Sequence, residues 1–133
     1  MPLAISTAWN AGGGKGASRL LFEIERLGFR NIELSFNLTP GLVAGIAQCA
    51  AKGGIAVTSV HNYCPIPPGF SRKAALPDCY SLASADARER NLAVRYSRKS
   101  IDTARRLGAK AIVLHCGGVE IEDKTRADRK SVV

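Results

Sequence analysis

Short apolar runs alternate along the chain with longer segments in which apolar residues recur every three or four positions. The run at residues 3–7 predicts a strand, and residues 18–27 have the spacing of an amphipathic helix. We expect Ser18 to be the N-cap of this helix and Gly28 to end it. A strand followed by a helix is the βα unit of parallel sheets.

The same alternation continues to residue 115. Thr39 and Pro40 predict an N-cap and a first helical residue. The proline-containing segment 62–82 is long for a connection in a compact domain, which is typical of lids and binding loops. The other expected elements are strands at 31–36, 55–61 and 110–115, helices at 40–50 and 84–107, and the start of a helix in 120–133. The helix at 84–107 is expected to bury Leu92, Ala93, Tyr96, Ile101, Ala104 and Leu107.

An internal repeat supports a parallel α/β fold. Residues 26–34 and 106–114 share a helix end, a glycine, a basic residue and an apolar strand. About four βα units fit either a small open sheet or half of a (β/α)8 barrel, and a complete barrel takes about 250 residues. An open nucleotide-binding sheet would have a GxGxxG motif after its first strand, and the sequence has none there. We therefore expect residues 1–133 to form the N-terminal half of a TIM barrel.

Candidate chemistry gathers where the predicted strands end, which is where α/β folds place their sites. Both histidines of the chain, His61 and His115, follow strands there. Strand alternation puts Glu33, Ser35 and His115 on one face through the internal repeat, and Val57, Ser59 and His61 on one face of the third strand. We expect Glu33, His61 and His115 to be catalytic, although a hydrogen-bonded structural cluster is the alternative.

Other residues at the strand ends are candidate substrate contacts. Trp9 offers an apolar wall for a sugar ring, with packing in the core as the alternative, and Asn10 and Asn62 follow strands in the same way. The glycine run 12–16 fails the P-loop pattern GxxxxGK[ST], but its backbone with Lys15 suits a phosphate or hydroxyl, unless it is only a flexible loop.

Cysteine spacing and charge narrow the function classes. The four cysteines show no CxxC pair, so we expect reduced thiols in or near a core and no disulfide framework. The net charge of +8 is compatible with an anionic partner, but no nucleic-acid-binding motif accompanies it. We expect a cytoplasmic protein without a membrane span or nucleic-acid partner.

Four segments, in order along nearly the whole chain, resemble the xylose isomerase-like TIM barrel proteins of the sugar phosphate isomerase/epimerase superfamily. They are the second strand with its preceding glycine (28–34, GFRNIEL), the end of the third strand (59–65, SVHNYCP), the long helix (88–109) and the fourth strand (113–118, VLHCGG).

The resemblance implies a sugar or sugar phosphate isomerase or epimerase that uses a divalent metal (Mn, Mg, Co or Zn). The same family includes the zinc-dependent endonuclease IV branch, and a resemblance to that branch would make His61 and His115 metal ligands. In the isomerase branch these histidines would line the pocket, and Glu33 would contact the substrate or support the site.

The family's strands five to eight, which carry most metal ligands, have no counterpart in the sequence. We therefore expect this chain alone to be weak or inactive as an enzyme. The alternative is a non-catalytic half barrel that pairs through its open sheet edges as a homodimer.

Overall fold

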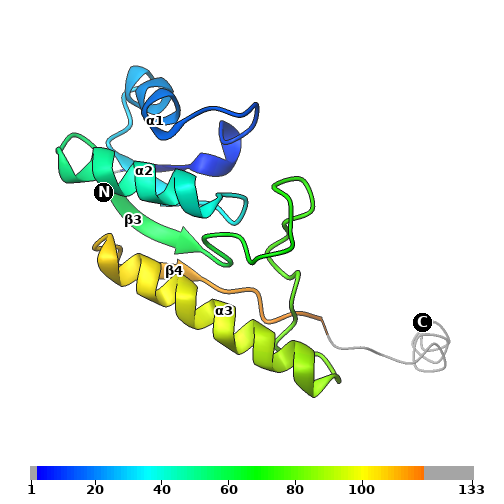
Figure 1. The fold of residues 1–133 in the computed structure, drawn as a ribbon. Helices are drawn as coiled ribbons and strands as arrows, with labels where there is room; N and C mark the ends of the chain where they lie inside the picture. Colours follow the sequence, from blue (N-terminus) through cyan, green and yellow to red (C-terminus); the bar gives the residue numbers. More distant parts are fainter. Residues whose placement is uncertain (1–2, 119–133) are drawn as a thin grey trace, which may run out of the picture.

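The computed structural model describes residues 3–118 of the chain, and the expected helix start in 120–133 lies outside them. Strands and helices alternate as predicted (Figure 1). The elements are β1 (Ala4–Ser6), the 3-10 turn η1 (Thr7–Trp9), α1 (Ala17–Arg26), β2 (Asn31–Leu34), α2 (Pro40–Ala51), β3 (Ala56–His61), α3 (Ala87–Arg106) and β4 (Ala111–Val113).

The four strands form one parallel sheet in the sequential order β1-β2-β3-β4. Residues of α1, α2 and α3 share one hydrophobic cluster with the sheet, so these helices cover the same face. A doubly wound sheet instead reverses its strand order and places helices on both faces. The described part of the chain therefore has the winding of a partial (β/α)8 barrel, which confirms the predicted fold class.

Local sequence signals account for the ends of two helices. The Thr39 hydroxyl accepts a hydrogen bond from the backbone N–H of Leu42 at 3.2 Å, so Thr39 caps α2 as predicted. Gly28 follows the end of α1 with a φ of +84°, a conformation that favours glycine. The prediction that Ser18 caps α1 is wrong: the N-cap is Gly16, and the Ser18 hydroxyl lies 3.7 Å from the Cys49 thiol on α2.

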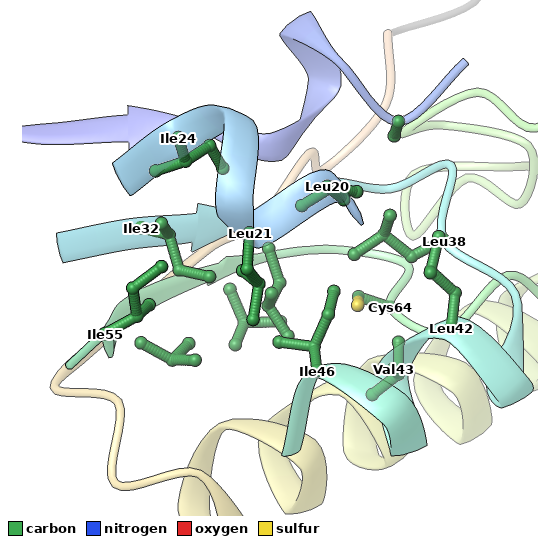
Figure 2. Packing of buried hydrophobic residues seen from close by; sticks show 14 of the residues in the cluster. Leu20, Leu21, Ile24, Ile32, Leu38, Leu42, Val43, Ile46, Ile55 and Cys64 are labelled. Atoms are coloured by element: carbon green, nitrogen blue, oxygen red, sulfur yellow. The ribbon is translucent and has the colours of Figure 1, made fainter. Parts of the chain in front are cut away.

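The core lies between α1, α2 and the outer face of the sheet (Figure 2). Leu20 and Ile24 of α1 meet Ile46 of α2 over Ile32 of β2, and all four side chains are fully buried. Fully burying one such aliphatic side chain contributes about 1.5–3 kcal/mol. Glycine at position 45 allows α1 and α2 to pack closely. A Cβ added there would lie 2.8 Å from the Cβ of Ala17, which would force the two helices apart.

The buried face of α3 differs from the predicted one. Ala93, Tyr96 and Ala104 are buried as expected, but Ile101 is 48% exposed. The buried face is completed by small polar side chains, which are Ser97, Ser100 and Thr103. Ser100 and Thr103 donate to carbonyls one turn back in the helix, and Ser100 also accepts from the backbone N–H of Cys64 at 3.0 Å. Hydrogen bonds thus replace part of the expected apolar packing.

The long segment between β3 and α3 packs on the protein through aromatic rings. Tyr80 stacks on Tyr96 of α3 with ring centroids 5.6 Å apart, and Phe70 meets Tyr80 edge-on at 5.5 Å. Tyr63 is almost fully buried and donates to the Tyr80 carbonyl at 2.7 Å. Burial raises the pKa of Tyr63 to about 12. The segment is therefore anchored, although it has no helix or strand of its own.

Candidate functional site

Glu33 lies on the face of the sheet opposite the helices. The register pairs Glu33 of β2 with Ser59 of β3, and the Ser59 hydroxyl donates to Glu33 Oε2 at 3.1 Å. Just before this pair, Ile32 aligns with Val57, so β3 has one extra residue, Thr58, as in a β-bulge. The prediction that Val57 shares a face with Ser59 is therefore wrong, since the bulge leaves Val57 with Ile32 in the core.

The two histidines come together from neighbouring strands. The ring centroids of His61 and His115 lie 4.9 Å apart with the planes tilted by 46°. The ring of Phe36, just after β2, lies 5.3 Å from that of His61. His61 Nδ1 lies 3.0 Å from the Asn62 carbonyl, which leaves Nε2 as the ring nitrogen without this contact. Two imidazoles and an apolar ring can hold a polyhydroxylated ligand by hydrogen bonds and by contact with its carbon face.

Asn62 positions the backbone around the histidines. It is fully buried, and its Oδ1 accepts from the backbone N–H of His115 at 3.1 Å. Its own N–H donates to the Val113 carbonyl at 2.9 Å, which extends the pairing of β3 with β4. The Asn62 Nδ2 atom is buried without a partner among the described residues. The side chain expected to bind substrate is thus buried and bonded to the backbone of His115.

The other predicted substrate contacts, Trp9, Asn10 and Lys15, lie after β1 and differ in exposure and in hydrogen bonding. Trp9 is 58% exposed, so its ring is open to a ligand. Asn10 is buried and donates through Nδ2 to the Leu20 carbonyl at 2.9 Å. The Lys15 ammonium group forms an ion pair with Glu23 of α1 at 2.7 Å. Asn10 and Lys15 therefore tie the glycine-rich loop to α1.

Glu23 is the anion of a small polar cluster. It accepts from Lys15, from Arg19 at 3.1 Å and from Asn10 at 3.3 Å. These hydrogen bonds, that of Lys15 first, lower the pKa of Glu23 from its ordinary 4.5 to about 2. Glu23 therefore stays ionised and keeps Lys15 at the loop over the whole neutral and mildly acidic range.

We expect Glu23→Gln to destabilise the protein near neutral pH and to have no effect below about pH 2. Because the folded pKa lies below the unfolded value, this stabilisation is fully present above about pH 4.5 and is lost as the pH falls toward 2. The measurement is the Tm difference between the variant and wild type across this range. Glu25→Gln is the control and should change Tm little, since within residues 3–118 the Glu25 carboxylate makes only an exposed 3.6 Å contact with Arg30. A Glu23→Gln effect that does not vary with pH would contradict the assignment.

Side chains that could bind a metal do not form a complete metal site within residues 3–118. No group of three or more histidine, cysteine, aspartate or glutamate side chains is close enough there to hold an ion. His61 and His115 are a pair only. The described cysteines are free thiols, as expected, but Cys116 is exposed instead of lying near the core. Cys64 is buried, which raises the pKa of its thiol to about 12.

Several polar residues at this edge of the sheet were given no functional role from the sequence. Buried Thr7 and Ser35 join the ends of β1 and β2 through a hydroxyl–hydroxyl contact of 3.0 Å, and Ser35 donates to Asn37 at 2.5 Å. The Arg72 Nε then donates to the Asn37 carbonyl at 3.2 Å. Arg72 comes from the long loop, where no periodic pattern marks individual side chains.

Comparison with known families agrees with this geometry. The family model described as "Xylose isomerase-like TIM barrel" matches residues 21–132, most of the chain. No curated protein and no solved structure matches the chain. The sheet winding, the polar inner face and the family match define an α/β barrel protein. The chain belongs to the xylose isomerase-like TIM barrel family, which includes sugar isomerases, epimerases and endonuclease IV members.

In residues 3–118, no helix has both the length and the apolar character to cross a membrane.

Proposed function

We propose that this chain is part of an isomerase or epimerase that acts on a sugar or sugar phosphate. The observation that carries the proposal is the arrangement of Glu33, His61 and His115 at the carboxyl ends of adjacent strands in a family that includes such enzymes. Active sites of (β/α)8 barrels lie at this edge.

The chemistry of these enzymes needs a group that removes a proton from carbon and groups that bind the neighbouring oxygens. Glu33 is the carboxylate at the site, and the Ser59 hydroxyl fixes its orientation by donating to Oε2. We assign Glu33 as the base that moves the proton between adjacent carbons, or between the two faces of one carbon. His61 and His115 hold the oxygens of the reacting carbons. Trp9 and Lys15 remain proposed substrate contacts, and Asn10 and Asn62, which are buried, are proposed to position the backbone around the site.

A divalent metal enters this proposal only because enzymes of this family often use one. Among residues 3–118, His61 and His115 supply at most two ligands, and a catalytic ion usually takes three from the protein. These residues alone therefore do not fit a metal centre, and we derive no step through one. Activity of this chain by itself is expected to be weak.

A second candidate is the zinc-dependent nuclease branch of the same family. Two imidazoles 4.9 Å apart are compatible with zinc ligation, and the net charge of +8 suits a phosphate backbone. Cleavage of duplex DNA that contains an abasic site, in the presence of Zn²⁺, would support this candidate over the isomerase.

The histidine composition makes a direct test possible. The chain has only two histidines, and both lie at the proposed site, so every imidazole signal in a nitrogen-15 NMR spectrum reports on it. We expect sugars or sugar phosphates to shift both sets of signals together and saturably. A parallel assay in D₂O should detect deuterium at the carbon next to the sugar carbonyl.

The two measurements have distinct meanings. Imidazole shifts with deuterium incorporation support an isomerase or epimerase. Shifts that appear only with Zn²⁺ and abasic DNA favour the nuclease. No response of either histidine to a panel of aldoses, ketoses and their phosphates would contradict the proposal.

A further inference from the structure

A hollow of about 350 Å³ lies between the first turns of α1 and α2 and the loop after β3. The segments around it follow β1, β2 and β3, so it opens at the same edge of the sheet as Glu33 and His61. Its lining is small and basic, and includes Gly14, Lys15, Gly16, Thr39, Gly41 and Arg72.

Arg72 brings a guanidinium group with unused hydrogen-bonding capacity to the wall of this hollow. Its Nε is anchored on the Asn37 carbonyl at 3.2 Å, which fixes the plane of the group. Its Nη2 is buried and has no partner among the described residues. A buried donor without an acceptor is costly, and a guanidinium nitrogen is best satisfied by an anionic oxygen.

Lys15, in the glycine-rich loop, adds a second cation to the lining of the hollow. The carboxylate that faces it, Glu23, also accepts from Arg19, so the cluster keeps an excess of positive charge. Glu23 fixes the position of Lys15 at a contact of 2.7 Å. Arg72 carries no ion pair within the described part of the chain, so its charge is also uncompensated.

The backbone at the hollow reinforces this charge. The N-cap of α1 is Gly16, which makes no side-chain capping bond, so the N–H groups of the first turn of this ten-residue helix lack intrahelical acceptors. Gly14, which lines the hollow, has a φ of +69°. Because glycine has no Cβ, its backbone is open to the hollow at this point. An anion can therefore come close to the backbone between Lys15 and Arg72.

We propose that this hollow binds the phosphoryl group of the substrate, so that the proposed isomerase acts on a phosphorylated sugar. That the substrate is a sugar rests on the proposed function. The phosphate site itself is argued from Arg72, Lys15 and the hollow. The oxygens of the phosphoryl group accept hydrogen bonds from the Arg72 guanidinium group and Lys15 Nζ. The carbon chain then extends along the sheet edge toward Glu33 and the histidines.

The test uses inorganic phosphate as the probe at constant ionic strength, followed by backbone amide NMR of the full chain. Phosphate should shift the amide signals of Gly16, Ala17 and Gly41 saturably. Arg72→Gln should weaken the affinity about tenfold or more, because it removes a charge-assisted bond. Lys73→Gln is the matched control, since exposed Lys73 neighbours Arg72 in sequence and does not line the hollow.

Lys15→Gln provides a second variant if Arg72→Gln does not fold, with exposed Lys52→Gln as its control. Equal phosphate affinity in wild type and both site variants, or no saturable shift at all, would overturn the proposal. Glu33→Gln should leave phosphate binding unchanged. Loss of sugar response at the histidines with intact phosphate binding would contradict the isomerase alone, so the two proposals fail separately.

Discussion

Replacing Ile46 by alanine should lower the free energy of unfolding by about 2–5 kcal/mol. Ile46 is fully buried in the middle of the α2 face that packs against α1 and the sheet (Figure 2). The substitution removes three carbon atoms from a closely packed cluster that relaxes only in part, so a cavity remains. Urea denaturation followed by circular dichroism measures the loss, with an unchanged m-value as evidence that the denatured state is the same.

Ile101→Ala is the matched control for this prediction. Ile101 also lies inside a helix, so the gain in helix propensity from alanine is the same in both variants. It is 48% exposed, and we expect a change within about 0.5 kcal/mol. The sequence pattern predicted Ile101 to be buried, so this pair of variants also tests the placement of α3. Equal destabilisation by both substitutions would contradict the structure.

The error at Ile101 shows what periodicity cannot resolve. α3 has apolar residues on more than one face, and Val94 and Ile101 lie on the exposed one. The buried face includes Ser97 and Ser100, whose hydroxyls a hydrophobic pattern counts as polar and therefore exposed. The Ser100 hydroxyl is needed at this position, because it accepts the backbone N–H of Cys64 from another element. Such a bond depends on tertiary structure and has no local sequence signal.

Features that depend on a few neighbouring residues were predicted well. Thr39 and Pro40 fix the start of α2 through a cap and a preset φ angle, and Gly28 ends α1 through its positive φ. The convergence of His61 with His115 follows from one rule, that parallel strands end at one edge of the sheet. The extra residue in β3 was missed, because alternation alone cannot locate a bulge. Arg72 was missed because it lies in a loop.

The substitution Glu33→Gln should reduce exchange of the substrate's carbon-bound proton with solvent by about 10²–10⁴-fold, the usual contribution of a positioned general base. Glutamine keeps the size of the side chain and can still accept from Ser59, but it cannot take up the proton. Because the lost interaction belongs to the chemical step, kcat should fall while KM changes little. Deuterium incorporation from D₂O, followed by proton NMR of the sugar, measures the step directly.

Two further variants separate the base from its support. Ser59→Ala removes the hydroxyl that donates to Glu33 Oε2 at 3.1 Å, so it should slow exchange by less than Glu33→Gln does. Glu89→Gln is the control: this carboxylate accepts from Ser81 and Ser84 at the start of α3, and its loss should leave the exchange rate unchanged. If Glu33→Gln exchanged as fast as Glu89→Gln, the proton would be moved by another group. The Glu33–Ser59 pair would then be a structural contact across the sheet, and the histidines would be the remaining candidates for the base.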